Sequence, residues 1–86
     1  MKRIANLSII VEDSNDDNIS KINSILHEYS EYILGRMGVP DKLHNVNIIS
    51  IALCASLDNL NSLTGKLGKI DGVSAKLLIS NKEYNN

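Results

Sequence analysis

The most informative stretch of the sequence runs from Leu63 to Val73 and reads LTGKLGKIDGV. Its leucines and Ile70 recur at the three- and four-residue spacing of an apolar helical face. Gly72 supplies a residue that tolerates a positive φ, and Val73 begins an alternating segment. We interpret the stretch as the end of a helix, a tight turn and the start of a strand.

Gly65 and Gly68 give this stretch a superficial likeness to a phosphate-binding loop. That loop needs four residues between its glycines, followed by Lys and then Ser or Thr. Here the glycines lie only three positions apart, inside a helical pattern. We expect them instead to let the helix approach the sheet or a partner subunit closely.

The segments on either side of this stretch follow strand and helix patterns. Residues 73–80 alternate as a strand, and the polar residues 81–86 are expected to form a frayed tail. Upstream, Val46–Ala55 is apolar on both faces, which is typical of a strand in the middle of a sheet. Ser56 then supplies the cap of the helix that ends before Gly72.

The first half of the chain repeats this plan. Residues 4–12 alternate as a strand, and the acidic and polar run that follows predicts a helix beginning near Asn15 and ending near Ser30. Glycines and Pro40 interrupt the helical pattern, so residues 32–39 are interpreted as a strand and residues 41–45 as a loop.

The element order is therefore β-α-β-β-α-β, the α+β plan called ferredoxin-like. Right-handed crossovers place both helices on one face of a four-stranded antiparallel sheet, with the first and third strands at its centre. We expect residues 1–80 to form a single domain of this kind.

This arrangement leaves one face of the sheet without a helical cover. We expect that face to carry Ser8, Ser50, Lys76 and Arg36 beside the apolar residues Ile4, Ile10, Ile48, Ala52 and Leu78. An apolar face is seldom left in water, and a chain of 86 residues has a small core. We therefore predict a homodimer or homotetramer, formed by stacking of two sheet faces with Ile10, Ile48, Ala52 and Leu78 at the contact, or by pairing of edge strands.

Composition excludes several classes of function. The net charge is −1 and the nine Lys and Arg are dispersed among ten Asp and Glu, so direct binding of nucleic acid is not expected. No apolar run reaches the roughly 20 residues of a membrane helix. The single thiol, Cys54, fits a reducing compartment, so the expected location is the cytoplasm. No arrangement of nucleophile and base is recognisable, and we expect no enzyme.

A metal site is an open alternative. His27 and Glu28 match the start of the zinc-protease helix motif, but Glu31 stands where its second His belongs. His27, His44 and Cys54 could in principle supply nitrogen and sulfur ligands, although no local spacing links them. The sequence names no cofactor.

The polar run from Glu12 to Asn15 is the other candidate site. A helix cap on a solvated face explains it, because Ser or Asn side chains accept the free amide hydrogens of a helix start. The turn between the first strand and helix also exposes amide groups that can hold a small ligand at an interface. We take Glu12, Asp13, Ser14 and Asn15 as candidate ligand-binding residues.

Almost the whole chain resembles the small regulators associated with the iron-only hydrogenase maturation system, a family with an ACT-like ferredoxin fold. The residues that carry the resemblance are 10–13, 26–31, 33–40 (ILGRMGVP), 63–68, Ile70, Gly72 and Val73. The resemblance implies an oligomeric sensor or effector module, related to the regulatory domains of amino-acid enzymes and to the C-terminal domain of the nickel-responsive repressor.

Two departures limit what the resemblance implies. No DNA-binding segment precedes the first strand, so the repressor's DNA-binding half is not expected. The second-strand region offers Arg36 and Met37 where the repressor has histidine ligands, so nickel is not implied. The leading hypothesis is a non-enzymatic regulatory module that binds a small-molecule effector or a partner protein. A metal-responsive module and a protein-interaction partner of maturation enzymes are the alternatives.

Overall fold

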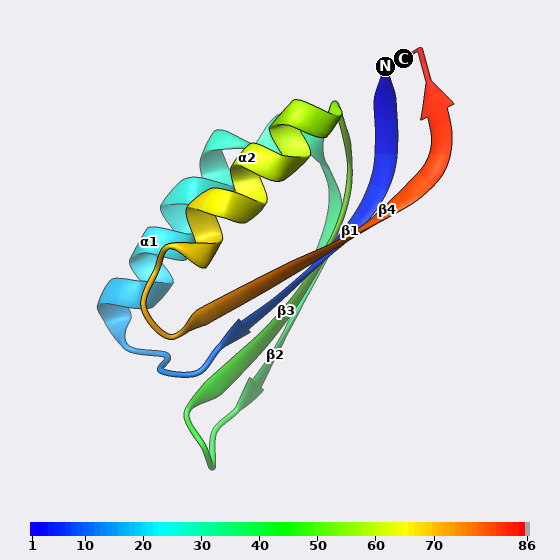
Figure 1. Ribbon diagram of the computed structural model, residues 1–86. Helices are drawn as coiled ribbons and strands as arrows, with labels where there is room; N and C mark the ends of the chain where they lie inside the picture. Colours follow the sequence, from blue (N-terminus) through cyan, green and yellow to red (C-terminus); the bar gives the residue numbers. More distant parts are fainter. Residues whose placement is uncertain (86) are drawn as a thin grey trace.

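The computed structural model describes residues 1–85 and shows a four-stranded antiparallel sheet with two helices on one face (Figure 1). The elements are β1 (Lys2–Val11), α1 (Asp16–Glu28), a short 3-10 helix (Ser30–Tyr32), β2 (Ile33–Asp41), β3 (Val46–Ala55), α2 (Leu57–Gly68) and β4 (Val73–Tyr84). The strand order is β2-β3-β1-β4. The predicted ferredoxin-like plan is confirmed, with β1 and β3 at the centre of the sheet.

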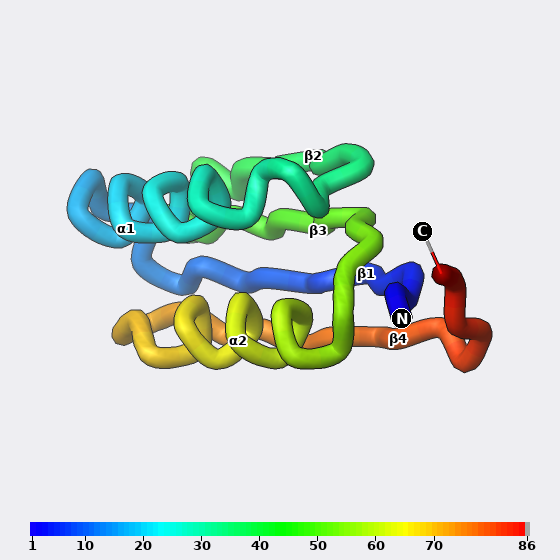
Figure 2. Tube along the Cα trace, turned by 90° about the horizontal axis from the view of Figure 1, so that it is seen from above, coloured from blue at the N-terminus to red at the C-terminus, as the bar shows by residue number. Residues whose placement is uncertain are grey.

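β1 contributes a row of fully buried side chains to the core. Leu7, Ile9 and Val11 have no exposed surface, whereas the residues between them face away from the helices. β3 pairs with β1 in a register that puts Ile49 and Ile51 on the helix side as well. Seen from above, β1 runs between α1 and α2 (Figure 2).

Both helices begin at side-chain caps of the kind that the sequence predicts. The Asn15 side-chain oxygen accepts the Asn18 amide hydrogen over 2.8 Å, and the Ser56 hydroxyl accepts the Asn59 amide hydrogen over 3.2 Å. These caps satisfy amide groups that the first helical turn leaves free. The apolar faces of the helices then pack on the sheet through Ile22, Leu26, Leu60, Leu63 and Leu67.

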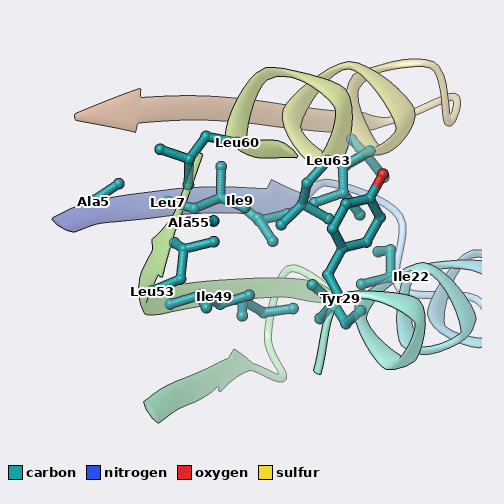
Figure 3. Close-up of a cluster of buried hydrophobic side chains, with 14 of the residues drawn as sticks. Ala5, Leu7, Ile9, Ile22, Tyr29, Ile49, Leu53, Ala55, Leu60 and Leu63 are labelled. Carbon is teal, nitrogen blue, oxygen red and sulfur yellow. The ribbon is translucent and has the colours of Figure 1, made fainter. Parts of the chain in front are cut away.

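The core is aliphatic, with Tyr29 as its one buried aromatic ring among the described residues. Figure 3 shows Leu7 and Ile9 of β1 lying among residues from α2 and β3, and Tyr29 reaching from the end of α1 toward α2. Leu, Ile and Val therefore fill most of the space between the two layers.

One buried polar side chain joins two turns at the same end of the sheet. Asn18 is 7% exposed. Its side-chain nitrogen, Nδ2, donates to the backbone carbonyl oxygens of Asp13 and Asp71 over 3.0 and 3.1 Å. Beside it, Gly72 has φ of 77° and its carbonyl accepts the Glu12 amide hydrogen over 2.7 Å. The predicted positive φ at Gly72 is confirmed.

β4 is longer than predicted. It continues through Asn81 to Tyr84, so the prediction of a frayed tail from residue 81 is wrong as far as Tyr84. The extension pairs with the start of β1, where Arg3 Nη2 lies 2.9 Å from Glu83 Oε1. Asn86, the last residue of the predicted tail, lies outside the described residues.

Two further side-chain placements differ from the prediction. Arg36 pairs with Ile51 and therefore lies on the helix side of the sheet, while Met37 lies on the other side opposite Ser50. Gly65 and Gly68 are exposed, and a Cβ added to either would meet no atom within 4 Å. These two glycines do not serve close approach to the sheet.

Asn18→Ala tests the connection between the two turns. Loss of two buried hydrogen bonds is expected to lower the free energy of unfolding by about 1–3 kcal/mol. The exposed Asn61 of α2 offers a matched control, and Asn61→Ala is expected to change it by less than about 0.5 kcal/mol. Urea unfolding followed by circular dichroism measures both, and equal effects would contradict a special role for Asn18.

Candidate functional site

The turn between β1 and α1 holds the predicted ligand-binding residues, and internal hydrogen bonds occupy it. The Ser14 amide donates to the Asn45 carbonyl over 3.1 Å, and the Asn47 side chain donates to the Ser14 hydroxyl over 2.9 Å. Asn45 has φ of 57° in the turn between β2 and β3, which brings its side chain 3.4 Å from Asp13. The turn thus caps α1 and joins two loops.

These contacts give the four candidate residues structural roles. Asn15 is the cap of α1, Ser14 and Asp13 bind the neighbouring turn, and the Glu12 amide binds Gly72. Asp16 and Asp17 add negative charge at the positive end of the helix dipole. Ligand binding at this turn stays a prediction.

The sheet face opposite the helices, here called the open face, gathers the residues predicted to form an oligomer contact. Ile10 lies opposite Ile48, and Asn6 lies between Ala52 and Leu78. Ile10, Ile48 and Leu78 are 43%, 48% and 74% exposed, and Ala52 is exposed too. All four predicted residues therefore share one solvent-facing surface.

β2 adds apolar residues to this surface that the sequence prediction missed. Met37 and Val39 pair with Ser50 and Ile48, and they are 63% and 47% exposed. The middle of the open face is polar, because Ser8 pairs with Ser50 on one side and with Lys76 on the other. The Ser50 hydroxyl also donates to the Asn6 side chain over 3.1 Å.

A hollow of about 420 Å³ opens at one end of the open face, lined in part by Ile4, Asn6 and Leu78. Ala5 pairs with Ile79 and Arg3 pairs with Glu83, so β4 contributes three residues where β1 contributes one. An irregularity of this kind bends the strand that contains the extra residues. Figure 1 shows β4 curving at this end, beside the start of β1.

The residues proposed as metal ligands do not come together within one chain. His27 is exposed on α1, His44 lies in the turn after β2, and Cys54 is near the far end of β3. His44 Nδ1 lies 2.7 Å from Asp41 Oδ2. Across residues 1–85, no three His, Cys, Asp or Glu side chains are arranged to hold a metal ion.

A polar cluster between the helices was not predicted. The Tyr29 hydroxyl lies 2.9 Å from the Ser62 hydroxyl, and the Lys66 amine lies 5.1 Å from the centre of the Tyr29 ring. The Ser62 hydrogen bond and the adjacent charge of Lys66 outweigh burial and lower the pKa of Tyr29. Ser62 and Lys66 are one helical turn apart, which is the only sequence signal for this cluster.

Comparison with known proteins identifies the family of this chain. The family model TM1266-like, described as "Iron-only hydrogenase system regulator, putative", matches residues 3–77. The chain belongs to this family. The resemblance inferred from the sequence is thereby confirmed.

A solved member supports the assignment. The structure of the uncharacterized protein TM1266 from Thermotoga maritima has a TM-score of 0.89 and 37% sequence identity, covering 92% of this chain and 98% of that chain. No curated protein sequence matches.

A more distant structure shows the fold alone. Formyltetrahydrofolate deformylase from Pseudomonas syringae pv. tomato has a TM-score of 0.68 at 14% identity, covering 96% of this chain and 29% of the deformylase. In the described part of the TM1266-like chain, neither helix has the length and apolar character needed to cross a membrane.

Ser62→Ala tests the origin of the lowered Tyr29 pKa. A background with Tyr32→Phe and Tyr84→Phe leaves Tyr29 as the only one of three tyrosines. In that background the Tyr29 pKa should lie below its ordinary value of about 10, and Ser62→Ala should raise it. Tyrosinate absorbance against pH measures the shift, with Ser24→Ala as an exposed control. An unchanged pKa in Ser62→Ala would contradict the assignment.

Proposed function

We propose that this protein is a non-enzymatic regulatory module of an iron-only hydrogenase system, and that it works in the cytoplasm as a homodimer or homotetramer. The regulatory role rests on the family to which the chain belongs. The oligomeric state rests on the open face. Stacking of two open faces is the contact that we propose.

The apolar content of the open face supports a covered surface. Ile4, Ile10, Met37, Val39, Ile48 and Leu78 are each more than a third exposed, and they lie on four neighbouring strands. Contiguous apolar surface on a soluble chain marks an interaction site more often than free surface. A core drawn from 86 residues also gains stability from association.

The pattern of the open face favours a second copy of the same chain as the cover. Apolar residues occupy both ends, with Ile10 and Ile48 at one end and Ala52 and Leu78 at the other, while the hydroxyls of Ser8 and Ser50 lie between them. A two-fold axis that crosses the strands along the row of Ser50 and Ser8 places each apolar end of one copy on the opposite end of its partner. The serines then face each other across the axis.

The size of the open face also fits a dimer. Four strands about 4.8 Å apart and about nine residues long cover roughly 19 by 30 Å, or about 600 Å² in projection. Side chains standing on the sheet raise the contact area toward the roughly 800 Å² per partner of a stable interface. Lys76 lies in the same row as Ser8 on the edge strand β4, so the two Lys76 side chains of the dimer meet only at the edge of the contact.

Ile48→Lys tests this proposal. Light scattering of the wild-type protein at micromolar concentration is expected to give at least twice the 9.5 kDa mass of one chain. A lysine at position 48 places a charge in the apolar contact with the partner. The variant is therefore expected to have the mass of a single chain. Leu43→Lys, in the turn between β2 and β3, removes a residue that is 86% exposed and should leave the mass unchanged.

Wild-type protein with the mass of a single chain would contradict the homo-oligomer. If that monomer instead bound a maturation enzyme through Ile48, the open face would belong to the protein-interaction alternative. Dissociation of both lysine variants to an equal extent would show that the effect is not specific to the open face.

A further inference from the structure

A groove of about 230 Å³ lies on the helix side of the sheet, between α1 and β2. Its accessible apolar part comes from Ile19, which is half-buried, and Pro40, which is exposed, above the buried Ile22 and Ile49, and its polar part comes from Arg36, Asn23 and Asn47. Since Arg36 and Gly38 pair with Ile51 and Ile49, both belong to the sheet side that faces the helices. The groove and the open face are therefore on opposite sides of the sheet.

Gly38 keeps the groove open. A Cβ at this position would meet no atom within 4 Å, and the residue has no positive φ. The backbone therefore does not require glycine here, and the missing side chain leaves space beside Ile49, its neighbour on β3. Gly35 has the same properties but pairs with Ala52, on the open face.

The polar groups of the groove favour an anion. Arg36 is the charged side chain of the lining, and it forms none of the ion pairs found in the described part of the chain. The Asn47 side-chain amide already donates one hydrogen bond to the Ser14 hydroxyl over 2.9 Å. Asn23 offers a second amide group from α1. No acidic side chain lines the groove, so nothing in it pairs with a cationic ligand.

We propose that this groove binds a short aliphatic carboxylate. A guanidinium group binds a carboxylate through two parallel hydrogen bonds, and Arg36 is placed to do so while Ile19 and Pro40 contact the aliphatic chain. The volume lies below the range of about 300–1,000 Å³ that holds drug-sized ligands, so the ligand is small. This proposal does not depend on the open face or on the oligomeric state.

The test uses 3-methylbutanoate as the probe. Added to the ¹⁵N-labelled full chain, it is expected to shift the amide resonances of Asn23, Gly38 and Asn47 in a saturable way. The uncharged analogue 3-methylbutanamide has the same shape and is expected to bind about tenfold more weakly. Arg36→Gln should cause a similar loss for the carboxylate.

Gly38→Val and Gly35→Val form a matched pair on one edge strand. Valine at position 38 fills the groove and should abolish the saturable shifts, whereas valine at position 35 faces the other side and should preserve them. The amide spectrum of each variant shows whether it is folded.

Three results would overturn the carboxylate site: no saturable shift in the wild-type protein, equal binding of the neutral amide, or full binding by folded Gly38→Val. Light scattering on the same samples keeps this outcome separate from the proposed function. A monomer that binds the probe contradicts only the homo-oligomer, and an oligomer that ignores the probe contradicts only the groove.

Discussion

The structure depends on the burial of one row of side chains, Leu7, Ile9 and Val11, in the central strand β1. β1 is hydrogen-bonded to a neighbour on each side, so the direction of this row also decides which residues of β3 and β4 face the helices. A slip of one residue would exchange the two faces of the strand. The same register therefore builds the core and assigns Ile10, Ile48 and Leu78 to the open face.

The acidic turn between β1 and α1, near Asn18, has a structural role, so the two faces of the sheet are better candidates for function. Asn18, Gly72 and Asn45 hold that turn through hydrogen bonds to its backbone and side chains. The side chains of Asp13, Ser14 and Asn15 thus already have partners that support the fold. The open face and the groove beside Arg36 instead present apolar surface and a cation to solvent.

The sequence predicts the order of elements, the helix caps and the central strands, because periodicity and capping chemistry are local. The sequence prediction places Arg36 on the wrong face because the pairing register of β2 shifts between Ile33 and Gly35. This shift moves Arg36 to the helix side of the sheet, and no residue pattern in the sequence indicates it. The prediction ends β4 too early because Asn81–Glu83 show no apolar alternation, and the strand is continued by the pairing of Glu83 and Tyr84 with β1. The groove and the Tyr29–Ser62 contact arise where separate elements meet, so spacing along the chain does not reveal them.

The central claim is that a second copy covers the open face, and methyl NMR with a soluble paramagnetic probe tests it most directly. Ile10 on the open face and Leu57 on α2 have the same 43% exposure in one chain. At concentrations that favour the oligomer, the probe should broaden the Leu57 methyl signals strongly and those of Ile10 weakly. Equal broadening of the two residues would contradict the account.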